Sequence, residues 1–404
     1  MTGALDRSLK DRGCRALLVL ATSSRDPDLA CFVGEIHLGE SFLLVTPDGS
    51  VRLAYLTEME RQEAAASGCQ LLDPESLNAL ELRRTSRTGA EFWQAVVVRA
   101  LESCAVAPGP IAVTGRLPAG MALEICRGLE GRGWPCRAGE ELVRLFRKRK
   151  TEAQLESARR AAAGAAQALR GVASLLAASV SRRGQLWLEG ERLKAARLRQ
   201  AIAETLALRG LEQPEGNIVA AGRDAAIPHT QGASSRALLE GESIVVDLYP
   251  RGAVFADCTR TFCVGEVPAR LAAAHAAVAE VLRRSHREAA AGLRAWELQR
   301  AACERPGALG YPTPLTQPGT TTGYVHGLGH GVGFELHEYP SFRESAGLEG
   351  LLESGDLFTL EPGLYDPAAG WGVRLEDLCC LTDGGLGNLT PLPYALDPRA
   401  WGEP

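Results

Sequence analysis

Residues 324–340 read YVHGLGHGVGFELHEYP and hold three of the seven histidines of the chain, His326, His330 and His337. Glycines alternate with other residues through the same run, at positions 327, 329, 331 and 333. Each glycine costs about 1 kcal/mol relative to alanine in a helix interior, so the run predicts an extended backbone packed closely against another segment. In an extended chain His326 and His330 share a face. Two interpretations follow: a site for a metal ion or an anionic intermediate, or a glycine-rich loop with incidental histidines.

The composition is that of an ordinary globular protein with more than one domain. Of the 404 residues, 46% are hydrophobic and 23% are charged, and this length exceeds what a single hydrophobic core usually supports. The net charge of −5 argues against a nucleic acid partner that is held by phosphate contacts. The basic run at residues 144–150 is interpreted as a solvated linker or helix face.

The cysteines and the N-terminus bear on the compartment. Eleven cysteines are scattered without a CxxC pair, which predicts free thiols in a reducing cytosol and no disulfide framework. The opening residues MTGALDRSLKDRG lack the apolar segment of a signal peptide, and no apolar run is expected to reach the length of a membrane span. We therefore expect a cytoplasmic protein with no membrane partner.

The first part of the chain, to about residue 149, alternates strand and helix patterns. Strands rich in Leu and Val are predicted at residues 15–21, 41–47, 51–56, 110–114 and 134–137, and helices at 88–104 and 119–129. This alternation predicts an α/β layer. The segment contains no cluster of histidines and acids, so its expected role is a scaffold, a cap or a dimer surface.

A change of composition near Lys148 marks the predicted domain boundary, with one domain at residues 1–148 and a second at 149–404. A long Ala-rich helix is predicted from Thr151, a plausible N-cap, to about residue 179. Further helices are predicted at about 188–208 and 268–292, between blocks that are rich in strand patterns.

Two of these blocks carry acids at the edges of apolar strands. Asp247 lies within the strand pattern 244–248, and Asp257 lies in the returning segment after a turn at Gly252. A carboxylate in such a strand is costly unless it is paired or bound to a cation. We expect the two aspartates to oppose each other directly across a hairpin, on one face.

The last block, residues 356–381, carries the other two acids. A strand at 357–360 ends at Glu361, and a single returning strand at 372–381 is expected to place Arg374 and Glu376 on one face.

Together these segments offer one imidazole and four carboxylates: Asp247, Asp257, His330, Glu361 and Glu376. Oxygen and nitrogen donors without a thiolate suit Mn, Co, Fe or Zn. Four carboxylates carry more charge than one divalent ion balances, so a pair of ions about 3.5–4 Å apart fits better. The alternative for each acid alone is a solvated position at a hairpin end.

The order of these motifs resembles the pita-bread metallopeptidases, the family of creatinase, aminopeptidase P and prolidase. The shared motifs are Asp-x9-Asp-x-Thr-Arg-Thr, HGLGHGVGFELHE, TLEPGLY and GVRLED, and they lie within residues 150–390. The resemblance implies an α+β fold: a pita-bread catalytic domain preceded by a smaller creatinase-type α/β domain. It also implies a homodimer.

The resemblance assigns roles to individual residues. It places the metal ligands on Asp247, Asp257, His330, Glu361 and Glu376, and the groups that bind substrate on His229, His326, His337 and Arg374. One departure is visible, because the two aspartates are ten positions apart here and eleven apart in most of the family.

The implied reaction is hydrolysis of the Xaa-Pro bond of a peptide with proline at its second position. Two divalent ions, manganese first and cobalt, zinc or iron as alternatives, would hold a bridging hydroxide as the nucleophile. Glu361 would take the proton of that water and pass it to the leaving nitrogen. His326 and His337 would hold the carbonyl and the developing oxyanion, and His229 would contact the substrate backbone.

Three functions are weighed. The first is a Xaa-Pro peptidase, either an aminopeptidase or a dipeptidase. A dipeptidase needs a basic group that binds the free carboxylate of its substrate at the far end of the cleft. Arg343 could be that group or could equally be solvated. The second is a creatinase-like amidinohydrolase without metal, and the third is a non-catalytic pita-bread binding protein. Members of the last two kinds lose carboxylate ligands, and this chain keeps all five candidates, which favours the peptidase.

Overall fold

The computed structural model describes residues 3–402, and the chain forms two compact units, residues 1–147 and 148–404. Each unit has its own sheets and its own hydrophobic core. All eleven cysteines are free thiols, and seven of them are buried.

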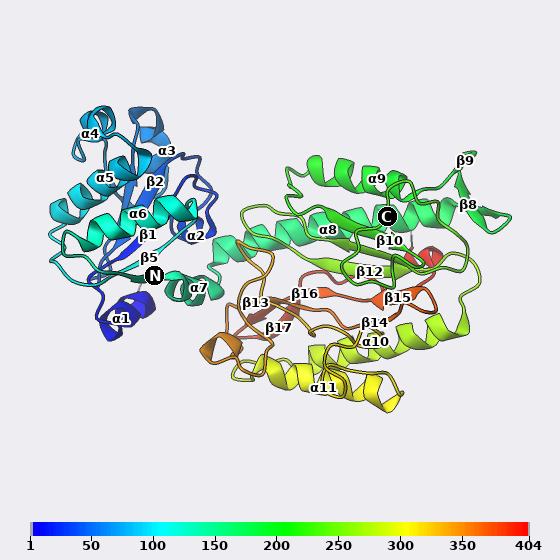
Figure 1. Cartoon of the computed structure of the whole chain (residues 1–404). Coiled ribbons are helices and arrows are strands. Elements are labelled where there is room, and N and C mark those ends of the chain that lie inside the picture. The colour runs from blue at the N-terminus through cyan, green and yellow to red at the C-terminus, as the bar shows by residue number, and fades with distance from the viewer. Residues whose placement is uncertain (1–2, 403–404) are drawn as a thin grey trace. The chain divides into compact units, whose positions relative to one another are not determined.

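The first unit is built on a mixed six-stranded sheet in the order β4-β3-β2-β1-β5-β6 (Figure 1). The strands are β1 (Leu17–Ala21), β2 (Ser41–Val45), β3 (Val51–Tyr55), β4 (Gln70–Leu72), β5 (Ile111–Thr114) and β6 (Cys136–Ala138). The helices are α1 (Gly3–Asp11), α2 (Pro27–Val33), α3 (Arg61–Ala66), α4 (Ala79–Thr85), α5 (Gly89–Ser103), α6 (Ala119–Glu130) and α7 (Glu140–Lys148), whose last residue belongs to the second unit. The predicted α/β layer is confirmed, whereas β4 and the short helices were not predicted.

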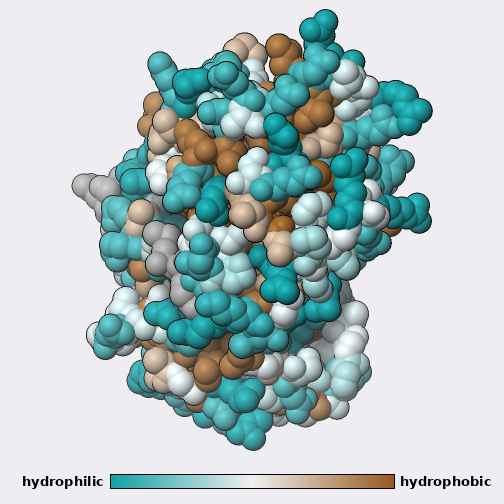
Figure 2. All heavy atoms as spheres, turned by 90° about the vertical axis from the view of Figure 1, so that its left-hand side faces the viewer, coloured by the Kyte–Doolittle hydropathy of each residue, from teal (hydrophilic) through white to brown (hydrophobic). Residues whose placement is uncertain are grey.

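The core of this unit lies between the sheet and its longest helix. Trp93 of α5 is fully buried and packs against Phe42 of β2, with 6.1 Å between the ring centroids. Figure 2 shows hydrophilic residues interspersed with small apolar groups on the surface. Among the described residues of this unit, the most exposed large apolar side chains are Met59, Leu80 and Leu123, and single exposed apolar residues are ordinary on a protein surface.

The second unit places strands between two pairs of helices (Figure 1). The helices are α8 (Glu152–Ala178), α9 (Ala195–Ala207), α10 (Ala269–Glu288) and α11 (Ala295–Ala308). One sheet has the order β10-β11-β12, from Asn217–Ala221, Ile244–Leu248 and Cys258–Phe262; a second has the order β13-β16-β17, from Leu357–Leu360, Asp377–Thr382 and Gly385–Asn388. A ribbon of β14 (Gly363–Asp366) and β15 (Trp371–Arg374) completes this layer, and β7 (Val180–Arg182), β8 (Gln185–Leu188) and β9 (Glu191–Arg192) form a separate small sheet. One core cluster joins α8 and α9 to the first sheet, and another joins α10 and α11 to the second.

Helix α8 begins where the sequence predicts. The Thr151 hydroxyl accepts a hydrogen bond from the Gln154 backbone N at 3.3 Å, and the Gln154 side chain accepts one from the Thr151 backbone N at 2.9 Å, which is a capping box. The expectation that no apolar run reaches membrane length is wrong for this helix, because its length and composition would suffice to span a bilayer. Half of its most apolar window is buried inside the protein, as in the core helix of a globular domain.

Two predicted helices have different bounds. The helix predicted from about residue 188 begins only at Ala195, because Glu189 and Gly190 both adopt positive φ, at 51° and 86°, and form the tight turn between β8 and β9. The helix predicted at 268–292 ends at Glu288, and α11 follows as a separate helix.

Two strand predictions are also corrected. Asp247 lies opposite Thr259, and Asp257 lies just before β12. Direct opposition of the two aspartates is therefore wrong, because the connection makes its own turn at Gly252, whose N donates to the carbonyl of Val254. The single strand predicted at residues 372–381 is two strands, β15 and β16, which pair with different partners.

Candidate metal centre

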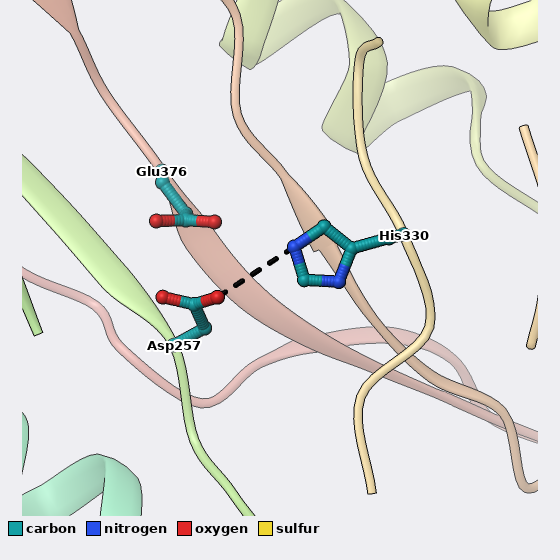
Figure 3. A group of neighbouring side chains, drawn as sticks. All are labelled: Asp257, His330 and Glu376. Carbon is teal, nitrogen blue, oxygen red and sulfur yellow. Dashed lines mark ion pairs between the residues drawn. The ribbon is translucent and has the colours of Figure 1, made fainter. Parts of the chain in front are cut away.

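Four carboxylates and one imidazole from separate segments of the second unit converge between its sheets. Asp247 comes from β11, Asp257 from the residue before β12, His330 from the histidine stretch, Glu361 from the end of β13, and Glu376 from the break between β15 and β16. Ligand atoms of Asp257, His330 and Glu376 lie within 4.8 Å of one another (Figure 3). Nε2 of His330 is 3.6 Å from Asp257 Oδ2 and 3.4 Å from Glu361 Oε1.

The histidine stretch contains no regular strand, but it packs against β13 as closely as its glycines predict. The backbone N of Thr359 donates to the carbonyl of His330 at 2.9 Å, and the backbone N of His330 donates to the Thr359 hydroxyl at 3.1 Å. A Cβ on Gly329 would overlap the carbonyl of Thr359. Only glycine therefore allows the chain to bring His330 this close to Glu361.

The imidazole of His330 is prepared to accept a cation. Its Nδ1 lies 3.0 Å from the carbonyl of Gly331, which leaves Nε2 facing the carboxylates. Burial, together with the neighbouring His337, lowers the pKa of His330 to about 3. The ring is neutral at physiological pH, which is the form that binds metals.

The carboxylates are crowded and buried. Burial raises the pKa of Asp257 and of Glu376 well above the usual values, and the negative charges of the neighbouring acids raise both further. Burial raises the pKa of Glu361 to about 8 against the lowering effect of Arg374. Oδ1 of Asp247 and Oδ1 of Asp257 are buried without a hydrogen-bond partner. Orphaned oxygens in a crowded acidic pocket fit a divalent cation, because a cation offsets the repulsion and coordinates the free oxygens.

Arg374 organises one side of the centre. Its Nη2 donates to Asp247 Oδ2 at 2.7 Å, its Nη1 donates to the Tyr365 hydroxyl at 3.0 Å, and its Nε donates to the Thr259 hydroxyl at 3.2 Å. The Thr259 hydroxyl in turn donates to Glu376 Oε2 at 2.7 Å. Tyr365 and Thr259 belong to the TLEPGLY and Asp-x-Thr-Arg-Thr motifs, but the sequence alone predicted no role for either residue.

His326 and His337 both lie near His330. Nδ1 of His326 is 2.8 Å from the carbonyl of Gly327, and Nε2 is 2.9 Å from the Tyr365 hydroxyl, so both of its nitrogens are engaged. The ring of His337 lies 4.2 Å from that of His330, measured between centroids. Burial lowers the pKa of His337, and it lowers that of His326 to about 4.

His229 lies on an exposed loop near these two histidines. The carbonyl of the preceding Pro228 accepts a hydrogen bond from Arg374 Nη1 at 3.1 Å. The charge of His229 contributes to the lowered pKa of both His326 and His337. The structure therefore brings all the residues predicted for the site to one region of the second unit.

Residues 156–383 match the profile of Metallopeptidase family M24, so the chain belongs to this family of metallopeptidases. Similar curated proteins include the Xaa-Pro dipeptidase of Pyrococcus furiosus, which is 36% identical over 188 residues, or 45% of this chain and 49% of the relative. The probable dipeptidase PepE of Mycobacterium tuberculosis is 32% identical over 198 residues, or 48% of this chain and 49% of the relative. The matches thus span about half the length of these relatives.

Solved structures match nearly the whole chain. The prolidase from Pyrococcus horikoshii OT3 has a TM-score of 0.74 at 22% identity and covers 97% of this chain and 98% of its own. The dipeptidase PepE from Mycobacterium ulcerans has a TM-score of 0.73 at 24% identity and covers 98% and 95%. These similarities establish the fold, so the predicted α+β class, with a pita-bread domain after a smaller N-terminal domain, is confirmed. Metallopeptidases of this family use divalent metals, and Asp257, His330 and Glu376 form a group that could hold one.

Proposed function

We propose that the protein is a metal-dependent peptidase that cleaves the Xaa-Pro bond of peptides. The observation that carries the proposal is the convergence of Asp257, His330 and Glu376 within one buried group, with Glu361 beside it and Asp247 held by Arg374. The substrate class is taken from relatives that are named Xaa-Pro dipeptidase and from neighbours named prolidase.

The metal ligands in this proposal are Asp247, Asp257, His330, Glu361 and Glu376. Four carboxylates favour two divalent ions over one, and manganese is the first choice among ions that take oxygen and nitrogen ligands. The bound ions would supply a water that is deprotonated near neutral pH as the nucleophile.

The other residues of the chain bind substrate and move the proton. Glu361 lies beside His330, with its Oε1 3.4 Å from Nε2 of that ring, and would accept the proton of the attacking water and return it to the leaving nitrogen. His337 would hold the carbonyl oxygen and the charge that develops on it. His326 would share this task by exchanging the Tyr365 hydroxyl for substrate. His229, on its exposed loop, would contact the substrate backbone, while Arg374 orients Asp247.

The remaining features of the proposal concern the whole protein. Residues 1–148 form a creatinase-type domain and residues 149–404 the catalytic domain. The protein works as a cytoplasmic homodimer on peptides, without a nucleic acid or membrane partner. A creatinase-like amidinohydrolase and a non-catalytic binding protein are disfavoured, because neither needs five convergent metal donors.

The decisive experiment compares two substrates with metal-loaded protein. We expect manganese-dependent hydrolysis of a Leu-Pro dipeptide; cleavage of a Leu-Pro-Gly tripeptide as well would identify an aminopeptidase. Asp247→Ala should abolish metal loading, as measured by elemental analysis, and leave the circular dichroism spectrum unchanged. Loaded protein that cleaves neither peptide would exclude the proposed substrate class.

A further inference from the structure

A buried ion pair joins the segment before α8 to the histidine stretch. Nζ of Lys150 contacts Oε1 of Glu338, and the two side chains are 0% and 1% exposed. Nζ of Lys150 also donates to the carbonyl of Lys148 at 3.1 Å, and the backbone N of Lys150 donates to the carbonyl of Gly355 at 2.8 Å. The lysine is therefore fixed at both its backbone and its side-chain end, and the proposed reaction uses neither member of the pair.

The acid of this pair directly follows His337. The backbone N of Glu338 donates to the carbonyl of Gly331 at 2.9 Å, and the backbone N of Gly331 donates to the carbonyl of Glu338 at 3.1 Å. Gly331 in turn directly follows His330. The ion pair thus lies at the base of a closed loop whose two ends carry the neighbouring imidazoles of His330 and His337, tilted by 48° to each other.

Gly333 of this loop packs directly against the pair. A Cβ on Gly333 would overlap the carboxylate of Glu338 and crowd the side chain of Lys150. The carbonyl of Gly333 accepts a hydrogen bond from the backbone N of Phe255 at 2.7 Å, two residues before Asp257. The loop conformation and the approach to Asp257 therefore both depend on where the Glu338 carboxylate lies.

We infer that Lys150 and Glu338 are positioning residues, which hold His337 beside His330 at the distance that the reaction requires. A buried ion pair adds little stability over an apolar pair of similar size, but it has a defined geometry that an apolar pair lacks. Lys150, anchored from outside the loop at Gly355, fixes the carboxylate relative to the start of β13 and hence to Glu361. The inference rests on the proposed function, because His337 needs its position only if it holds the substrate carbonyl.

The test uses Glu338→Gln and Lys150→Met in the full-length, manganese-loaded protein. We expect the metal content to remain that of the wild type, kcat on Leu-Pro to fall at least tenfold, and KM to change less than threefold. Amide hydrogen exchange should accelerate in peptides that cover residues 331–338 and stay unchanged in β10, β11 and β12. The matched control is Arg236→Met, which removes the ion pair of Arg236 with Glu242 in the same unit and should keep kcat within twofold.

Each outcome separates this inference from the function on which it rests. Variants that keep kcat within twofold with unchanged loop exchange would overturn the positioning role. Exchange that accelerates evenly over residues 148–404 would also overturn it, since the pair would then serve stability alone. Wild-type protein that cleaves no Xaa-Pro peptide would refute the proposed function, and the exchange pattern would still test the positioning. Glu338→Gln keeps the size of the side chain and carries the test if Lys150→Met does not fold.

Discussion

At the scale of single residues, the centre combines groups that destabilise one another in the absence of a cation. Asp257 and Glu376 are buried close together. The charge of Glu376 raises the pKa of Asp257, and the charges of Glu361 and Asp247 raise the pKa of both. Arg374 offsets part of this repulsion through Asp247. Removal of one negative charge here should therefore stabilise the metal-free protein. The same change should destabilise the metal-bound protein, because it removes a ligand.

Asp257→Asn removes one of these charges and keeps the size of the side chain. In metal-free protein we expect the free energy of unfolding to stay within about 1 kcal/mol of the wild type or to rise, because a crowded buried acid is replaced by a neutral amide. The stabilisation by manganese, about 2.7 kcal/mol at a metal concentration of 100 Kd, should be lost. Urea titrations with and without manganese measure both effects. Asp383→Asn, which changes an exposed acid, should keep the metal response.

A second residue governs the response of stability to pH. Burial lowers the pKa of His275 in α10 to about 4, against a hydrogen bond to the Tyr394 backbone and with a further contribution from Arg283 and Arg260. The unfolded chain binds this proton near pH 6.5, so the contribution to stability is complete above pH 6.5 and is lost as the pH falls toward 4. The shift corresponds to about 2–3 kcal/mol after allowance for partial solvent contact.

His275→Gln should remove this dependence. We expect the free energy of unfolding of metal-free wild type to fall more steeply between pH 6.5 and 4 than that of the variant, as measured by urea titration at several pH values. Parallel curves would show that His275 does not bind its proton in this window.

At the scale of elements, the contact between the histidine stretch and β13 sets the geometry of the centre. This contact involves backbone on both sides, from Gly329 to Thr359, so no side chain can move to relieve a clash. By contrast, the atoms nearest to a Cβ on Gly327 lie 3.8–3.9 Å away, which is ordinary contact. Two glycines of the same alternating run therefore have different tolerance.

Gly329→Ala and Gly327→Ala form a matched pair that tests this difference. We expect Gly329→Ala to lower the free energy of unfolding by about 1–3 kcal/mol, as overpacking does in a dense core, and to weaken manganese binding. Gly327→Ala should stay within about 1 kcal/mol of the wild type and keep its metal. Thermal unfolding and metal titration provide both measurements, and equal effects of the two substitutions would argue against the close contact.

At the scale of the whole molecule, all the metal donors belong to one of two compact units. Residues 1–147 form a sheet and core of their own, and the donors lie between residues 247 and 376 of the other unit. Metal bound at the proposed donors would therefore stabilise the second unit directly.

Removal of metal should show this division. After chelation we expect faster amide exchange in β11, β12 and β13, and unchanged exchange in β1, β2 and β5, as measured by mass spectrometry. Adding manganese back should restore protection. An equal loss of protection in the six-stranded sheet of the first unit would contradict the prediction.

The sequence predicts those parts of the fold that depend on local pattern. The N-cap at Thr151 and the apolar strands of both units are found as expected. The break between β15 and β16 could not be predicted, because Val373, Leu375 and Leu378 continue an apolar pattern while their strands pair with different partners. Helix α11 was missed because Pro306 and Gly307 disfavour a helix by propensity alone.

The same distinction holds within the site. The donors could be named because each lies in a motif with its own sequence signal. The roles of Tyr365 and Thr259 depend on which side chains meet across β12, β14 and β15, and that requires the register. The register in turn depends on the turn between β11 and β12, where the hydrogen bond from Gly252 to Val254 moves Asp257 away from direct opposition.

The scatter of the donors along the chain has a consequence for biosynthesis. Asp247 is translated long before Glu376, and at about 5–20 residues per second the interval is on the order of ten seconds. During that time the nascent polypeptide lacks Glu376, one of the three residues of the buried group. The proposed centre therefore cannot be complete before the final β segments have been synthesised, so the newborn protein would take up its resident ion only after that point.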